Sequence, residues 1–348
     1  MWGRILGLVP YGLGFAPDNC LVLLGFGGPD LKGAWRYDLE ALPGGQRAAG
    51  ILGRITANLR ANGVSAVAAA GYGPARLVTP VADRLRLAAS SAGLRVVEVT
   101  RVEGARYWSY IRDGPLEGLP VEAPAAGYAA TLGPVFPSRA ALAAAIAPVA
   151  GSAGAVMAAA TARAEQQVAR LAAAGPPDSP GARQAVASAG IAAVTRAIGI
   201  YRDGGMLSGT EEIAWLSVLL ADEWVLDDAC ARMEPGYALA HRRLWADVTS
   251  WARPGYVAAP ASLLAFTALQ SGAGALANVA IGRALSDKPG FPMAKALRKR
   301  VVDGPPLYHA APVMTPQQVD RTHRNHAGNP LPGQRPGLGG ESTEPEQQ

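Results

Sequence analysis

The sequence predicts an α/β domain at the N-terminus, built on a mixed and partly parallel sheet with covering helices, followed by an all-helical domain. Three observations carry this prediction. Short apolar runs alternate with helix-like segments up to residue 114, Pro and Gly punctuate residues 115–137, and apolar residues recur at helical spacing from residue 138 onward. Strands that alternate with helices need crossover connections, which place some neighbouring strands in parallel.

The first predicted strand is the apolar run Cys20–Phe26, which is followed by the turn cluster Gly27-Gly28-Pro29-Asp30. Residues Ala34–Leu39 alternate between apolar and polar side chains, so we expect them to pair back on this strand as a hairpin. Gln46–Ala61 carries apolar residues three to four positions apart. This spacing indicates a helix with one apolar face, which ends at Gly63.

Val64–Ala70 predicts a short buried strand, and the turn Gly71–Pro74 then leads into a second helix that ends at Gly93. The residues of this helix that are expected to face one way are Leu77, Val81, Leu85 and Ala88. Leu94–Val102 and Arg106–Arg112 predict a final strand pair across the Glu103-Gly104 turn.

Capping residues mark where helices begin in the second half. Ser138 is expected to cap a long alanine-rich helical region that breaks at Pro148, and Ser179-Pro180 is typical of the start of the next helix. Ser208 with Glu211 fits a capping box. It predicts one helix that continues through Met233.

Further helices are predicted at residues 237–252, 259–271, 274–287 and 292–302. The segment Pro260–Arg300 is similar to a tetratricopeptide unit, and ordinary helix packing is the alternative interpretation. From His309 onward the Pro, Gly, Gln and Glu content predicts a disordered tail. We therefore divide the chain into an α/β domain at 1–114, a Pro/Gly-rich linker at 115–137, a helical domain at 138–308 and a tail at 309–348.

Composition limits the classes of function. The chain has 348 residues, of which 17% are charged, and its formal net charge is +5 with the basic residues scattered singly. Such diffuse charge disfavours nucleic acid as a partner, because nucleic-acid-binding proteins gather Lys and Arg on one face. The run Arg298-Lys299-Arg300 is expected to be a solvated helix face.

Two apolar stretches need testing against a membrane role. Ile5–Phe15 is interrupted by Pro and Gly, and Asp18-Asn19 stands where a signal peptide needs small residues. Ala140–Ala162 is long enough to cross a bilayer but contains Pro148, several Gly and few strongly apolar residues. We therefore expect a cytoplasmic protein without a membrane partner.

The sequence predicts neither a metal site nor a cofactor. Cys20 and Cys230 are far apart and belong to no C-x-x-C motif, and the predicted α/β domain contains no His. The densest acidic group, which is expected to be a solvated helix face because no Glu-x-x-His element accompanies it, consists of Asp222, Glu223, Asp227 and Asp228.

The turn Gly71-Tyr72-Gly73 is the best candidate for an anion site. It follows a predicted strand and leads into a helix N-terminus, where free N–H groups attract anions, although a tight turn that needs glycine explains the same residues. For Arg101 and Trp108 a core and edge role is the favoured interpretation, and the alternative is that Arg101 lines a polar pocket at the sheet rim together with Asp38. The candidate residues for a small anionic ligand are thus Asp38, Gly71, Tyr72, Gly73, Arg101 and Trp108.

The segment Val9–Pro17, leading into Leu21-Val22, resembles the opening of an actinobacterial family, domain of unknown function 4192. The later landmarks that appear in the same order are Gly71–Pro74, Arg101 with Tyr107–Tyr110, Pro137-Ser138-Arg139, and Ala259–Phe266 through Pro289-Gly290. Asn19-Cys20 departs from the acidic-then-serine pair of that family, and Gly12 replaces a leucine. The resemblance covers nearly the whole chain before the tail and implies an architecture without a known activity.

Two functions from different classes fit these observations. The favoured hypothesis is a non-catalytic cytoplasmic module that binds a ligand through the α/β domain or a protein partner through the helical domain. The alternative is an enzyme that acts on a phosphorylated or nucleotide-like molecule through carboxylate and arginine groups at the sheet rim, using Asp38, Arg101 and the Gly71–Gly73 turn. Missing histidine, thiol and metal motifs favour the first hypothesis.

Overall fold

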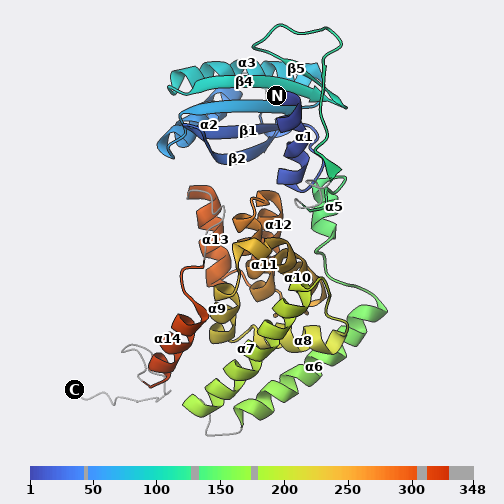
Figure 1. The fold of residues 1–348 in the computed structure, drawn as a ribbon, viewed down its shortest axis with the longest axis vertical. Coiled ribbons are helices and arrows are strands. Elements are labelled where there is room, and N and C mark those ends of the chain that lie inside the picture. Colours follow the sequence, from blue (N-terminus) through green and yellow to red (C-terminus); the bar gives the residue numbers. More distant parts are fainter. Residues whose placement is uncertain (43–45, 127–132, 174–178, 304–311, 329–348) are drawn as a thin grey trace, which may run out of the picture.

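The computed structural model describes residues 1–42, 46–126, 133–173, 179–303 and 312–328. The sheet and its helices lie at one end of the molecule in Figure 1, and the remaining helices form a separate layer beneath them. The predicted fold class, an α/β part followed by a helical part, is confirmed.

The described strands form one six-stranded sheet in the order β2-β1-β3-β4-β5-β6 (Figure 1). The strands are β1 Cys20–Gly27, β2 Asp30–Asp38, β3 Ala66–Tyr72, β4 Arg95–Glu103, β5 Arg106–Ser109 and β6 Leu119–Pro120. β3 and β4 are parallel, because helix α3 (Ala75–Ser91) connects them as a crossover, and every other neighbouring pair is antiparallel. The sheet is therefore mixed and partly parallel, as predicted.

Helices α2 (Gln46–Ala61) and α3 cover one face of the sheet. Alternate strand residues point to this face, so Leu21 and Val67 share one buried cluster with Leu52 of α2 and Leu85 of α3. The predicted facing of α3 was wrong at one position. Leu77 is 39% exposed and Val78 is buried in its place, because the two neighbours fit the helical spacing equally well and only packing on the sheet separates them.

The opposite face of the sheet packs on helix α1 (Trp2–Leu13) and the helical half. Cys20 and Val22 of β1 belong to the same continuous buried cluster as Trp2 and Leu6 of α1, together with Trp245 in the helical half. The sheet is therefore buried on both faces, and the two halves of the chain share one core.

Helix α1 was not predicted, because its Gly and Pro residues suggest an interrupted stretch. The glycines have a packing role. A Cβ at Gly7 would lie 1.9 Å from the carbonyl oxygen of Glu122, and one at Gly3 would lie 2.7 Å from that of Pro120. Glycine thus lets a segment more than 100 positions away lie directly against the helix.

Residues 115–137 contain more structure than a simple linker. Besides β6, they include Phe136, whose backbone N–H donates to Gly14 O at 2.9 Å and whose oxygen accepts from Ala16 N at 2.8 Å. These bonds form a parallel bridge between Phe15 and Phe136. The start of the chain is therefore fastened to the beginning of the helical half.

The helical half contains α5 Arg139–Ala144, α6 Ser152–Ala172, α7 Pro180–Arg202, α8 Thr210–Leu219, α9 Glu223–Ala231, α10 Ala238–Trp251, α11 Ala258–Gln270, α12 Gly274–Asp287 and α13 Pro292–Asp303. Short 3-10 turns lie at Leu39–Ala41 and Pro235–Tyr237. The predicted caps at Ser138 and Ser179 are confirmed, since their hydroxyls accept backbone hydrogen bonds at 3.1 and 3.2 Å.

The single helix predicted from Ser208 through Met233 is wrong. The chain forms α8 and α9 instead, and the N-cap of α8 is Gly209. The break has a local cause, because the carboxylate of Asp222 accepts a hydrogen bond from Val225 N at 3.2 Å and so begins a new helix. The predicted capping box is also displaced, since Glu212 rather than Glu211 reaches back to the backbone N–H of Ser208.

The prediction of a disordered tail is wrong for one segment. Helix α14 spans Pro316–Gly328 and packs on α9 and α7. Its Val319 is buried between them, which provides the apolar contact that the polar composition of the segment does not suggest. Residues 304–311 and 329–348, where the rest of the predicted tail falls, lie outside the described residues.

Within the described part of the chain, no helix combines the length and apolarity needed to cross a membrane. The apolar stretch Ala140–Ala162 is divided between α5 and α6.

Helices α11 and α12 form a closely packed pair. The similarity of this pair to a tetratricopeptide unit stays a prediction.

Candidate functional site

The sequence-predicted site residues all lie at one end of the sheet, where β3 and β4 finish. The strand register divides them between two faces. Gly71, Arg101 and Trp108 are directly opposite one another across neighbouring strands and share the α3 face. Tyr72 and Asp38 are each opposite Cys20, and they share the α1 face.

On the α3 face, Arg101 already has two partners. Its guanidinium lies 3.8 Å from the ring centroid of Trp108 and forms an ion pair with Glu103. The indole N–H of Trp108 in turn donates to Leu116 O at 2.8 Å. This cluster fastens the loop before β6 onto the edge of the sheet.

On the α1 face, Asp38 pairs with Arg36, whose Nη2 lies 2.6 Å from the carboxylate. Arg36 also lies over the ring of Phe15, at 5.6 Å from its centroid. Burial raises the pKa of the neighbouring Cys20 thiol to about 11, so this sulfur is protonated and not a nucleophile at neutral pH. Asp38 and Arg101 therefore do not converge on one pocket.

The turn Gly71–Gly73 has a structural explanation at both glycines. A Cβ at Gly71 would lie 2.2 Å from Cγ1 of Val78, so this position lets α3 pack against β3. Gly73 has a φ of +136°, and its N–H donates to Val102 O at 3.0 Å. The N–H of Gly73 is therefore already used within the fold.

The buried hydroxyl of Tyr72 has no hydrogen-bond partner among the described residues, and burial raises its pKa. It belongs to the core cluster that joins the sheet to α1. The side chain contributes packing there.

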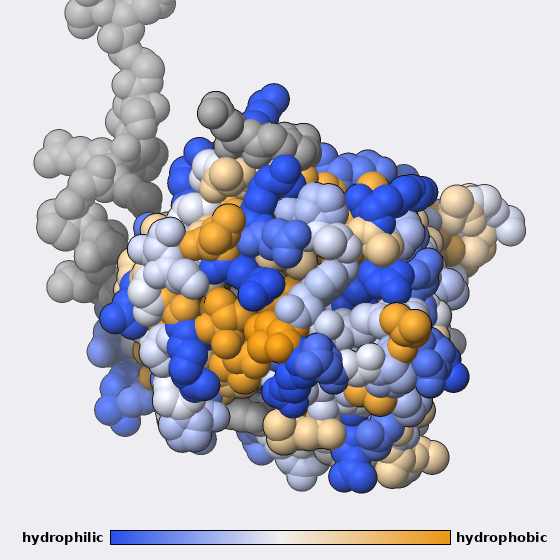
Figure 2. Space-filling view, turned by 90° about the horizontal axis from the view of Figure 1, so that it is seen from above, coloured by the Kyte–Doolittle hydropathy of each residue, from blue (hydrophilic) through white to orange (hydrophobic). Residues whose placement is uncertain are grey.

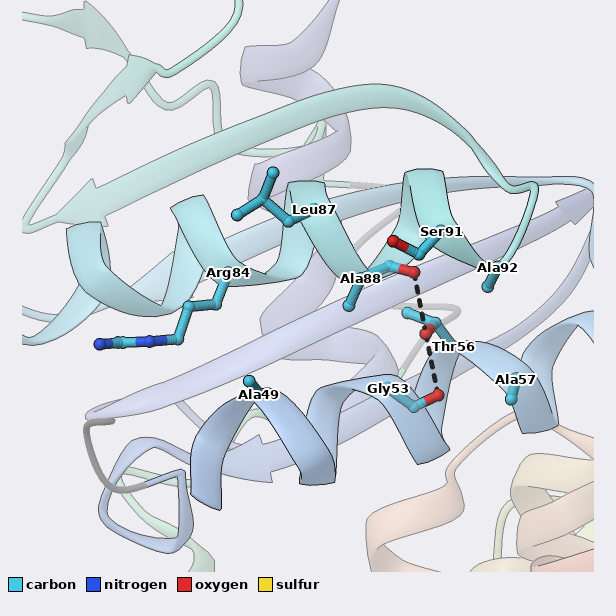
Figure 3. Close-up of a pocket in the computed structure, with 9 residues that line it drawn as sticks. All are labelled: Ala49, Gly53, Thr56, Ala57, Arg84, Leu87, Ala88, Ser91 and Ala92. Atoms are coloured by element: carbon cyan, nitrogen blue, oxygen red, sulfur yellow. Dashed lines mark hydrogen bonds between the residues drawn. The ribbon is translucent and has the colours of Figure 1, made fainter. Parts of the chain in front are cut away.

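Sequence reasoning missed an open groove of about 450 Å³ between α2 and α3 (Figure 3). Its lining consists of Ala49, Gly53, Thr56, Ala57, Arg84, Leu87, Ala88, Ser91 and Ala92. The hydroxyl of Thr56 lies 3.1 Å from the carbonyl oxygen of Gly53 and 3.3 Å from that of Ala88 on the other helix. This polar contact sets the spacing of the two helices below the groove.

Small side chains keep the groove open. A Cβ built on Gly53 meets no atom within 4 Å, and Leu87 stands 71% exposed at the border. Seen from above, the end of the molecule that carries α3 shows an apolar area bordered by hydrophilic residues (Figure 2). No local sequence signal announces this groove, because it depends on how far apart two helices lie.

The two helices that form the groove are strongly basic. Their arginines are Arg47, Arg54, Arg60, Arg76, Arg84 and Arg86, and their one acidic residue is Asp83. Arg84 donates to Pro80 O, and none of the six forms an ion pair with another described residue. The α2–α3 surface therefore presents several guanidiniums without an ion-pair partner among the described residues.

The acidic group on α9 is only partly a solvated face. Glu223 and Asp227 are exposed, but Asp228 is 2% exposed and pairs with Arg232 through contacts of 2.5 and 3.0 Å. The prediction was wrong for Asp228 because the helix turns this residue inward.

Among the described residues, no three His, Cys, Asp or Glu side chains are grouped as metal ligands.

Comparison with known proteins agrees with the architecture. The profile of one protein family, described as a domain of unknown function, matches residues 3–306, which include the sheet, its covering helices and the helical half as far as α13. No curated protein and no solved structure matches the chain. Because the family match covers most of the sequence, the chain belongs to the family Domain of unknown function (DUF4192).

Proposed function

We propose that this chain is a non-catalytic, cytoplasmic interaction module, and that the groove between α2 and α3 binds an acidic segment of a partner protein. The observation that carries the proposal is the coincidence of an open apolar groove with arginines that have no acidic partner within the described fold. An acidic partner supplies the carboxylates that these guanidiniums lack.

The shape of the groove favours a protein segment. Gly53, Ala57 and Ala88 give it a shallow apolar floor, on which a helix can lie closely and bury its own apolar side chains. Arg84 lines the groove, and Arg60 follows Thr56 by four positions on the same side of α2. Acidic residues on either side of an apolar stripe would meet both arginines.

Nucleic acid is a poorer fit to the same surface. Neither α2 nor α3 contains an aromatic residue on which a base could stack. An apolar floor also offers nothing to a phosphate backbone. The charge and the apolar groove together fit an amphipathic protein segment better.

Enzymatic chemistry at the sheet rim is the alternative that the geometry supports less. It would need Asp38 and Arg101 to act on one substrate, and the strand register points them to opposite faces. Each is also engaged, Asp38 by Arg36 and Arg101 by Glu103 and Trp108. A small anionic ligand at Gly71–Gly73 would likewise have to replace the bond from Gly73 to Val102.

The test is selection of a displayed library of 15-residue helical peptides on the full-length protein and on its Gly53→Leu variant. Leucine at position 53 places a bulky side chain in the groove, and its Cβ meets no atom within 4 Å. We expect the wild type to enrich peptides that carry Asp or Glu beside an apolar stripe, and the variant to lose this enrichment. Equal enrichment on both proteins, or no acidic enrichment on the wild type, would contradict the proposal.

Charge reversal gives a second readout with a matched control. For a selected peptide, Arg84→Glu is expected to weaken binding at least tenfold, because Arg84 lines the groove. Arg76→Glu makes the same change in charge near the start of α3, at a position that does not line the groove. It is expected to change binding less than threefold, so an equal loss in both variants would show that only net charge matters.

A further inference from the structure

Helix α14 occupies a surface of α7 and α9 that is separate from the α2–α3 groove. Val319 of α14 is 3% exposed and forms a small buried cluster with Trp224 of α9 and Ala187 of α7. Ile191 and Ala231 pack around it. This surface therefore accepts one aliphatic side chain beside an indole.

His323 and Arg324 complete the contact through the same tryptophan. The imidazole of His323 is stacked on the Trp224 ring, with centroids 5.4 Å apart and planes 9° apart, and its Nε2 lies 2.9 Å from Oδ2 of Asp227. The guanidinium of Arg324 lies 5.8 Å from the Trp224 centroid. Val319 and His323 are four residues apart and so lie on one side of α14.

Charge complements the apolar contact. The exposed side of α9 presents the carboxylates of Glu223 and Asp227, whereas α14 carries Arg321, His323 and Arg324. Asp320 also belongs to α14, and it pairs with Arg324 within the helix. The surface is thus aromatic and acidic, and its occupant is a helix with basic and imidazole groups.

Helix α14 lies outside the part of the chain that the family profile matches. The family match ends at residue 306, whereas α14 begins at Pro316. The α7 and α9 residues that receive it lie inside the matched region. A 13-residue helix with one buried aliphatic side chain is marginal by itself, so it depends on this surface for its structure.

We propose that the surface around Trp224, Asp227 and Ala187 is a second interaction surface, for helices that present an aliphatic residue followed four and five positions later by His and Arg. Helix α14 is its occupant within the chain. A helix of another molecule that has the same pattern can bind this surface only when α14 dissociates from it. The position of α14 therefore controls whether the surface is accessible. This inference does not depend on the α2–α3 groove.

The experiment uses the full-length protein with Val319→Asp, which places a carboxylate in the cluster beside Trp224. The probe is a labelled peptide of residues 312–325. We expect backbone amides of α14 to exchange hydrogen much faster in this variant, and the peptide to bind it at least tenfold more tightly than it binds the wild type, whose own α14 competes at high effective concentration. Gln317→Asp is the matched control, because Gln317 is exposed on the same helix. It should behave as the wild type.

A second variant identifies the surface. Adding Trp224→Ala to Val319→Asp removes the ring on which His323 stacks and should abolish peptide binding. Circular dichroism melting of each variant checks that the rest of the fold is intact. The proposal is overturned if Val319→Asp leaves the exchange of α14 unchanged, if a released α14 does not increase peptide binding, or if peptide binding survives Trp224→Ala.

Discussion

The carboxylate of Asp287 accepts a hydrogen bond from the backbone N–H of Ala258 at 2.9 Å, although Ala258 is the first residue of α11 and Asp287 is the last residue of α12. The same carboxylate accepts from Val257 N at 3.0 Å and from Gly255 N at 2.6 Å. It therefore satisfies the free donors at the start of α11 from the end of α12. A single side chain at the end of α12 thus links the two helices at the end of the pair that is opposite their connecting turn.

Asp287→Ala is expected to destabilise the protein by about 1–2 kcal/mol, because it leaves three backbone N–H groups at the start of α11 without their acceptor. Asp287→Asn keeps one carbonyl oxygen and should lose less. Urea denaturation measures both changes. Ser286→Ala, at the exposed neighbouring position, is the control and should be close to neutral; a loss of equal size there would point to helix propensity instead.

Two glycines of α7 should respond to alanine with opposite signs. A Cβ at Gly190 would lie 2.3 Å from Cγ2 of Val225, so Gly190→Ala forces α7 and α9 apart and should cost about 1–3 kcal/mol. A Cβ at Gly199 meets nothing within 4 Å, so Gly199→Ala should stabilise the helix by up to about 1 kcal/mol. Thermal melting of both variants compares them. Similar effects would show that helix propensity, not the α7–α9 contact, controls stability.

His241 should make the protein less stable below neutral pH. It is buried in α10 with both ring nitrogens unpartnered among the described residues, and burial, with Arg202 nearby, lowers its pKa to about 4. The unfolded chain takes up the proton near pH 6.5 and the folded protein does so only near pH 4. The unfolding free energy should therefore fall as the pH drops below 6.5, by about 2 kcal/mol at pH 5.

The control for this prediction is His241→Leu, which removes the titrating group and keeps an apolar side chain of similar size. Urea denaturation of both proteins at pH 7.5 and pH 5 gives the comparison. The loss of stability between the two pH values should be smaller in the variant. An identical loss in both proteins would assign the acid sensitivity to other groups.

Neither cysteine should react with thiol reagents in the folded protein. The pKa of Cys20 is raised to about 11 and that of Cys230 to about 12, mainly because both thiols are buried. The thiolate is the reactive form, so Ellman's reagent at pH 8 should label both sulfurs only after unfolding in guanidinium. Fast labelling of one thiol in the native protein would show that its segment opens to solvent.

Local patterns in the sequence predicted most of the sheet and most of the helices. The Ser138 and Ser179 caps are read from neighbouring residues, and both are confirmed. Helix α1 could not be predicted in this way. Its Gly3 and Gly7 accommodate a segment near residue 122, and a sequence window of one helix carries no information about that segment.

The candidate site was harder to predict, for a related reason. Asp38, Gly73 and Arg101 do gather at one end of the sheet, as the strand order implies, but the register decides which face each side chain takes. The α2–α3 groove was missed because it depends on how far apart the two helices lie, which no local sequence pattern shows. Only the structure shows that Arg60 and Arg84 form no ion pair with another described residue.

Helix α1 leaves the ribosome long before two of the segments that hold it. Gly3 O accepts from Glu122 N at 3.1 Å, and α1 also packs against α12, which begins at Gly274. At translation rates of about 5–20 residues per second, its apolar side chains wait roughly 10–50 s for that helix. During this interval the apolar side of α1 lacks that partner, which makes the helix a suitable target for a chaperone until α12 has been synthesised.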